Sequence, residues 1–133
     1  MSRTTVGADI RARIADLIDE GSAADVAVTE RLVRSFLQRQ AGLLDRLADA
    51  VAEGDTDGAA YHAHALKGAA GNMGATVVTG LCAEAEELAT AADRARLAGY
   101  PNLLRSALAD ASEELNLALA ELRTCYQLPV PQD

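Results

Sequence analysis

Tryptophan is absent from this chain of 133 residues, and aromatic residues make up only 3% of it. Aromatic and β-branched residues favour strands, so a sequence that is poor in them gives little support for a β-sheet. Half of the residues are apolar, and most of these are alanine and leucine, which are strong helix formers. The composition therefore predicts an all-α protein, and the length predicts a single domain with its own hydrophobic core.

Positive charge is scarce as well. The 12 lysine and arginine residues are outnumbered by 20 aspartate and glutamate residues, which gives a net charge of -8 and a pI near 4.7. Phosphate backbones and anionic membranes are bound by clustered Lys and Arg side chains, whereas the basic residues of this chain are few and dispersed. We therefore expect neither a nucleic acid nor a membrane as a partner.

Cysteine motifs and long apolar segments are also missing. Cys82 and Cys125 are far apart in the sequence and form no CxxC pair, which predicts free thiols in a reducing compartment. The N-terminus lacks the apolar core of a signal peptide, and no stretch approaches the roughly 18 apolar residues of a membrane span. These absences predict a soluble, cytoplasmic protein.

Apolar residues recur at the three-and-four spacing of amphipathic helices along most of the chain. The predicted helices cover residues 8–20, Ser22 or Asp25 to Glu53, Asp55 or Thr56 to about Asn72, Ala75 to a point before Gly99, and Pro101 to about Cys125. Four long amphipathic helices with short connections bury their apolar faces together most simply in a bundle. The predicted fold is an antiparallel four-helix bundle with a short additional N-terminal helix. We expect one domain over residues 1–133, with a core of about 8–125 and frayed termini.

Two local features of these helices can be tested against the structure. The second helix has Val28 and Leu32 in its apolar stripe, while Gln40 and Gly42 weaken its middle, so we expect either one long helix or two helices joined by a bend. After it, Gly54 is expected to end the helix. Either of the next two residues could cap the third helix by accepting a hydrogen bond from a free backbone N–H.

A chemically distinct stretch runs from Tyr61 to Ala75. It contains both histidines, His62 and His64, the only lysine, Lys67, and three of the ten glycines. The rest of the chain is built mainly of Ala, Leu, Asp, Glu and Arg. This concentration of reactive and small residues indicates a functional site.

On a helix, successive residues are about 100° apart, so this stretch has two faces. One face carries Ala60, His64, Lys67, Gly68, Gly71 and Ala75, and the opposite face carries His62, Leu66, Ala69 and Met73. His62 shares its face with apolar side chains, so we expect it to be partly buried and to contact a neighbouring helix. His64 shares its face with a cation and glycines, which predicts an exposed side chain.

The residues beside His64 suit a phosphorylated histidine. Imidazole is a nucleophile near neutral pH because its unperturbed pKa is about 6.5. Lys67 lies one helical turn further on, where its ammonium group can reach phosphate oxygens. Gly68 removes a side chain that would crowd the ring. This arrangement places a nucleophile on a convex helix rather than in the cleft that encloses most small-molecule substrates.

The run His64-Ala65-Leu66-Lys67-Gly68, continued by Ala69-Ala70-Gly71-Asn72-Met73-Gly74-Ala75, resembles the phosphorylation motif of histidine-containing phosphotransfer (HPt) domains. The preceding turn, Glu53-Gly54-Asp55, is similar to the Gly-Asp-like turn that such domains have before this helix. Two positions depart from the pattern. Ala69 stands where serine is common, and His62 is a histidine that the motif does not require.

The resemblance implies a phosphorelay intermediate of two-component signal transduction. His64 would accept a phosphoryl group from the aspartate of one response-regulator receiver domain and pass it to the aspartate of another. Lys67 would be the phosphate-side cation and Gly68 the clearance residue, and Ala60, Gly71 and Ala75 would contact the partner. The expected partners are receiver domains and a sensor or hybrid histidine kinase, and we expect this chain to be a monomer.

The sequence contains neither a GxxxxGK[ST] phosphate loop nor a Gly-rich kinase loop. We therefore expect a phosphocarrier without its own kinase activity or ATP site. It should need no cofactor of its own, and the partner receiver domain is expected to supply Mg²⁺.

Two other functions fit parts of the sequence. The chain could be a non-catalytic helical adapter that binds receiver or kinase domains, with its glycines serving helix packing. His62 and His64 could also be metal ligands, but residues two apart diverge on a helix and a third ligand is not evident. The HPt interpretation accounts for more of the residues than either alternative.

Overall fold

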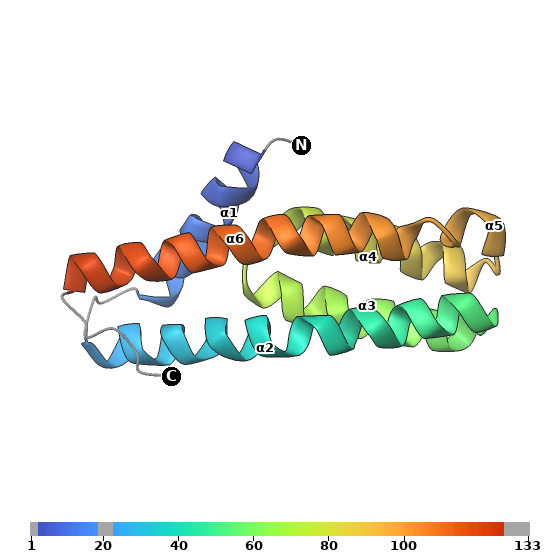
Figure 1. The fold of residues 1–133 in the computed structure, drawn as a ribbon, viewed down its shortest axis with the longest axis horizontal. Coiled ribbons are helices and arrows are strands. Elements are labelled where there is room, and N and C mark those ends of the chain that lie inside the picture. Colours follow the sequence, from blue (N-terminus) through green and yellow to red (C-terminus); the bar gives the residue numbers. More distant parts are fainter. Residues whose placement is uncertain (1–2, 19–22, 127–133) are drawn as a thin grey trace.

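The computed structural model describes residues 3–18 and 23–126, and all of its regular elements are helices (Figure 1). In chain order they are α1 (Arg3–Leu17), α2 (Ala23–Glu53), α3 (Thr56–Asn72), α4 (Thr76–Thr90), α5 (Arg94–Leu97) and α6 (Tyr100–Tyr126). The predicted all-α fold is confirmed. No helix in the described part of the chain is both long and apolar enough to cross a bilayer.

Helices α2, α3, α4 and α6 form the four-helix bundle. Glu30 of α2 contacts Arg123 of α6, and Gln40 further along α2 contacts Ser112 of α6, so these two helices are antiparallel. With 31 and 27 residues, α2 and α6 are much longer than α3 and α4, which have 17 and 15. One end of the α2–α6 pair therefore extends beyond the α3–α4 hairpin.

Helix α1 packs against this extension of the bundle (Figure 1). Its core-facing side chains are Val6, Ile10, Ile14 and Ile18, all of them buried. Arg11 fastens the same helix to α6 through ion pairs with Glu114 at 3.1 Å and Glu121 at 2.7 Å. The predicted N-terminal helix is thus present, although it begins at Arg3 instead of residue 8.

The second helix contains the main differences from the prediction. α2 is one continuous helix through Gln40 and Gly42, so the alternative with one long helix is the correct one. Asp25 lies inside its first turn rather than at its cap, and Ser22 lies outside the described residues. Val28 and Leu32 are not core residues, because their exposed fractions are 47% and 44%. The buried stripe instead follows positions Val26, Thr29, Val33 and Phe36, which point away from them.

The segment between Ala75 and Gly99 is also divided more finely than its apolar pattern indicates. α4 ends at Thr90, and Ala92 has a φ of 54°, a left-handed conformation that breaks the helix. The Asp93 side chain then accepts a hydrogen bond from the backbone N–H of Arg96 and caps the four-residue α5. The single helix that apolar spacing favours is therefore replaced by α4, a turn and α5.

Both glycine turns that flank α3 have the predicted positions. At its start, Gly54 has a φ of 71°, and the Asp55 carboxylate accepts a hydrogen bond from the Gly58 N–H at 2.9 Å. This geometry makes Asp55 the cap of α3. At its end, the helix stops at Asn72 and Gly74 reverses the chain with a φ of 71°.

Helix α1 holds the second of these turns in place. Arg13 Nε donates a hydrogen bond to the Asn72 carbonyl at 2.9 Å, and Thr76 Oγ1 donates one to the Asp9 carboxylate at 2.6 Å. The backbone of α1 comes so close that a Cβ added to Gly74 would lie 2.8 Å from the carbonyl oxygen of Asp9. Gly74 is therefore required both for its conformation and for the lack of a side chain.

This double requirement predicts that Gly74→Ala lowers the free energy of unfolding by about 2 kcal/mol or more, because it adds backbone strain and a steric clash. The matched control is Gly42→Ala, in the middle of α2, where an added Cβ meets nothing within 4 Å. It should raise the free energy of unfolding by up to about 1 kcal/mol, since alanine is the better helix former. Urea denaturation of both variants measures the two effects, and equal stabilities would contradict the role given to Gly74.

Candidate functional site

His64 stands on the solvent-facing side of α3, and 70% of its side chain is exposed. On the opposite side of the same helix, Ala63 and Leu66 have no exposed surface. Gly68 and Gly71 are exposed, and a Cβ added at either position would meet nothing within 4 Å. The predicted two-faced helix is thus present, with a free surface on the C-terminal side of His64.

Two residues of the predicted face are less accessible. Ala60 is only partly exposed and packs at the edge of the core. Ala75 has an exposed fraction of 1% and is the cap of α4, not a residue of α3. The projection that placed Ala75 beside His64 is wrong because the helix ends at Asn72 and Gly74 turns the chain away. Ala75 therefore offers no side-chain surface to a partner.

His62 is partly exposed, as its position between the two faces indicates. Its ring contacts Tyr61 edge to face, with the ring centroids 5.2 Å apart. This contact is with the adjacent residue rather than with the neighbouring helix that the sequence suggested. The Tyr61 side chain itself is 72% exposed, one turn before His64.

The closest polar neighbour of His64 comes from α4. The Nδ1 atom of His64 lies 3.2 Å and 3.3 Å from the two carboxylate oxygens of Glu86. Lys67 Nζ donates a hydrogen bond of 3.0 Å to one of the same oxygens. A single carboxylate thus holds both the histidine and the lysine of the predicted motif.

Glu86 was not among the residues singled out from the sequence, although one signal could have found it. Ala75 is the midpoint of the hairpin between α3 and α4, and in an antiparallel pair residues equally far from the midpoint lie side by side. His64 precedes Ala75 by eleven residues (75 − 64) and Glu86 follows it by eleven (86 − 75). The missing step was to combine the predicted turn with the position of the motif.

The ion pairs also set the protonation of this carboxylate. Its hydrogen bond with Lys67, and secondarily the one with His64, lower the pKa of Glu86 below the ordinary carboxyl value. The nearby Cys82 behaves differently, because burial raises the pKa of its thiol to about 12. Glu86 is therefore a carboxylate at neutral pH, and Cys82 is a neutral core side chain rather than a second nucleophile.

The site is open rather than enclosed. A shallow hollow of about 450 Å³ adjoins Lys67 and Glu86, and Ala83, Glu87, Thr90 and Ala91 form the rest of its lining. His64 stands outside this hollow. Among residues 3–18 and 23–126, no three His, Cys, Asp or Glu side chains are grouped as a metal site would require. The geometry leaves the His64 ring accessible to a large partner instead of surrounding a small substrate.

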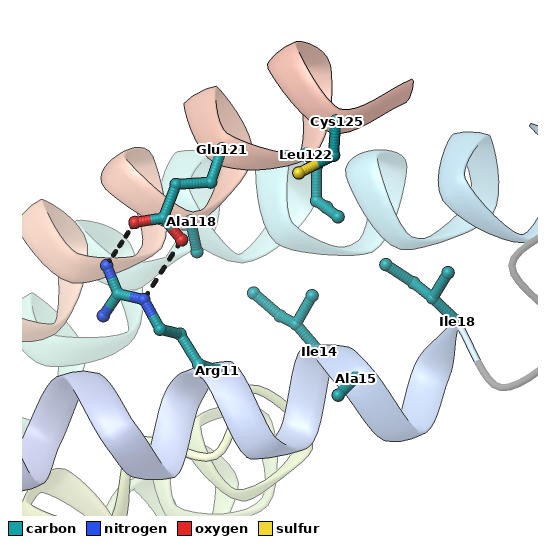
Figure 2. A pocket seen from close by; sticks show the side chains of 8 residues that line it. All are labelled: Arg11, Ile14, Ala15, Ile18, Ala118, Glu121, Leu122 and Cys125. Atoms are coloured by element: carbon teal, nitrogen blue, oxygen red, sulfur yellow. Dashed lines mark hydrogen bonds and ion pairs between the residues drawn. The ribbon is translucent and has the colours of Figure 1, made fainter. Parts of the chain in front are cut away.

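A larger apolar groove lies elsewhere, between α1 and α6 (Figure 2). Ile14 and Ile18 of α1 face Leu122 and Cys125 of α6 across it, and the ion pair between Arg11 and Glu121 closes one end. None of the residues of the phosphorylation motif lines this groove. It is therefore a separate feature of the extended end of the bundle.

The shared carboxylate leads to a prediction about pH. A lowered pKa means that Glu86 stabilises the folded chain above the ordinary carboxyl value of about 4.3, and that this contribution is lost as the pH falls through the lowered value. Lys67→Met should raise the pKa of Glu86 towards its ordinary value, as measured by a ¹³C NMR titration of the carboxyl group. Arg105→Met is the control, since Arg105 contacts Asn102 instead. An unchanged Glu86 pKa in Lys67→Met would refute the ion pair.

Comparison with known proteins agrees with this geometry. No curated protein and no solved structure matches the chain. The family model described as the Hpt domain matches residues 31–125, which include the whole of α3, α4 and α5 and most of α2 and α6. Helix α1 and the first residues of α2 precede the matched region. With most of its length matched, and with an exposed histidine on the central helix of the bundle, the chain belongs to the Hpt domain family.

Proposed function

We propose that this chain is a phosphorelay intermediate that carries a phosphoryl group on His64 between the aspartates of two receiver domains. Membership of the Hpt family supports a role in histidine phosphotransfer. The observation that carries the assignment to His64 is its position, because it is a 70% exposed imidazole within hydrogen-bond distance of a carboxylate that also binds Lys67. His62 has no such neighbours.

In the proposed transfer, a ring nitrogen of His64 attacks the phosphorus of the receiver's aspartyl phosphate. A nitrogen–phosphorus bond forms, the bond between phosphorus and the aspartate oxygen breaks, and the electron pair leaves with the carboxylate. Lys67 is one helical turn away, and its flexible side chain can turn from Glu86 to the phosphoryl oxygens. The same bonds break and form in reverse when the phosphoryl group moves to a second receiver domain.

The partner is proposed to supply the remaining catalytic groups. Mg²⁺ prefers several oxygen ligands, whereas the charged groups at His64 are one carboxylate and one ammonium. The metal ion would therefore belong to the receiver domain, and a sensor or hybrid histidine kinase would provide the phosphoryl group from ATP. This chain would act as a carrier without kinase activity.

The surface beside His64 is suited to a transient contact. Gly68 and Gly71 leave open space on the side of the ring that faces the C-terminal half of α3. A carrier has to release one partner before it meets the next, which favours a small interface of the weak, short-lived class. The proposed complex is one copy of this chain with one receiver domain at a time.

His64→Gln should abolish phosphoryl transfer from a phosphorylated cognate receiver domain, since glutamine lacks the nucleophilic ring. His62→Gln is the matched control and should accept the label at nearly the wild-type rate. The product on wild-type protein should be acid-labile and base-stable, as measured with a radiolabelled receiver domain. Label that persists in His64→Gln and is lost in His62→Gln would overturn the assignment, and a fully competent His64→Gln would instead favour a non-catalytic adapter.

Gly68→Leu should slow transfer from a receiver domain by about tenfold or more, because the added side chain occupies the space through which the partner reaches the ring. Labelling by phosphoramidate, a small phosphoryl donor, should change little in the same variant. Gly99→Leu is the control, since Gly99 is equally open but lies between α5 and α6. If both donors are slowed alike in Gly68→Leu, the residue does not provide clearance for a protein partner.

A further inference from the structure

The orientation of the His64 ring distinguishes its two nitrogens. Nδ1 faces the Glu86 carboxylate, with both oxygens within 3.3 Å. Nε2 has no hydrogen-bond partner among the described residues, and it belongs to a side chain that is 70% exposed. The ring therefore has one nitrogen held by the protein and one available for chemistry.

This contact determines where the ring proton lies. An ionised carboxylate can only accept hydrogen bonds, so the short contact with Nδ1 requires a proton on that nitrogen. A neutral imidazole has one N–H, and its other nitrogen then carries a lone pair. With the proton on Nδ1, the lone pair is on the exposed Nε2 atom, where an incoming phosphorus atom can approach.

From this geometry we propose that Glu86 is a positioning residue that keeps a proton on Nδ1 of His64 both before and after a phosphoryl group binds to Nε2. This inference rests on the proposed phosphocarrier function and adds a residue that the His-Lys-Gly motif does not contain. Glu86 touches neither the phosphorus nor the partner in this scheme. It acts through the protonation and orientation of the ring.

The retained proton matters most in the second half of the reaction. Attack by Nε2 leaves a positive charge in the ring, and the proton on Nδ1 then faces the negative charge of Glu86. If this proton stays, the later break of the nitrogen–phosphorus bond returns the electron pair to Nε2 and releases a neutral imidazole. If it is lost, the same step would have to release an imidazolate anion, which is a much poorer leaving group.

The surrounding charges keep Glu86 in the form that this role needs. Lys67 of α3 donates a hydrogen bond to it and holds its pKa low, so the carboxylate stays ionised as the ring titrates. From α4, Cys82 has its pKa raised by burial and stays a neutral thiol, and Glu87 lines the adjoining hollow and adds negative charge nearby. No described side chain of α2 makes a hydrogen bond or ion pair with His64 or Glu86. The nearest cation, Lys67, can turn to the phosphoryl group once it arrives.

The first test uses the unphosphorylated protein alone. In the wild type at pH 8, the ¹⁵N shifts of His64 should show the proton on Nδ1. In Glu86→Ala the proton should move largely to Nε2, whereas Glu87→Ala, a matched change on the same helix, should leave the wild-type pattern. Circular dichroism checks that each variant is folded. A wild-type ring with its proton on Nε2, or the same tautomer in the wild type and Glu86→Ala, would overturn the proposal.

The second test follows the phosphorylated protein, prepared with phosphoramidate, which releases ammonia as the nitrogen–phosphorus bond forms. The pH midpoint for loss of the Nδ1 proton, measured by ¹⁵N NMR, should be lower by about one unit in Glu86→Ala and Glu86→Gln than in the wild type and Glu87→Ala. The rate of phosphoryl loss should fall with the same midpoints. Equal midpoints in all four proteins would contradict the role of Glu86.

Both tests can be read without a receiver domain, which separates them from a failure of the proposed function. A chain that is phosphorylated by phosphoramidate and shows the expected midpoints, yet accepts nothing from any receiver domain, would refute the phosphorelay assignment and leave the role of Glu86 intact. Transfer from a receiver domain with unchanged midpoints would have the opposite meaning.

Discussion

The close packing of α3 against α4 is the interaction on which the site depends. The buried side chains of α3 are Ala59, Ala63, Leu66 and Ala70, and those of α4 are Val78, Cys82, Ala85 and Ala89. Most of these are small, so the two helices can approach closely. Because of this approach, a glutamate of α4 reaches the histidine and lysine of α3 without extending into a partner's path. The same packing gives α3 one fully buried face and one free face.

Much of the fold could be predicted from the sequence because its signals are local. Apolar spacing identified the bundle helices, and Gly54, Asp55 and Gly74 marked turns through a left-handed φ or a side-chain cap. The errors arose where a local pattern has two readings. Val28 and Leu32 have helical spacing, but only the packing of α1 and α6 decides which side of α2 is buried.

The candidate site divides in the same way. His64, Lys67 and Gly68 are close in sequence and on one helix, so their spacing alone predicts their arrangement. Glu86 is 22 positions from His64 (86 − 64), and its contact depends on the register of two helices. Ala75 was misplaced for a related reason, since helical projection is valid only as far as Asn72, where α3 ends.

The open position of His64 has a consequence for how long a signal could be stored. An enclosed site would exclude water from a bound phosphoryl group, whereas a ring that is 70% exposed leaves it in contact with solvent. Hydrolysis would then compete continuously with delivery to the next protein. The carrier would work as a leaky store, in which the concentration of waiting partners decides how much of the signal arrives.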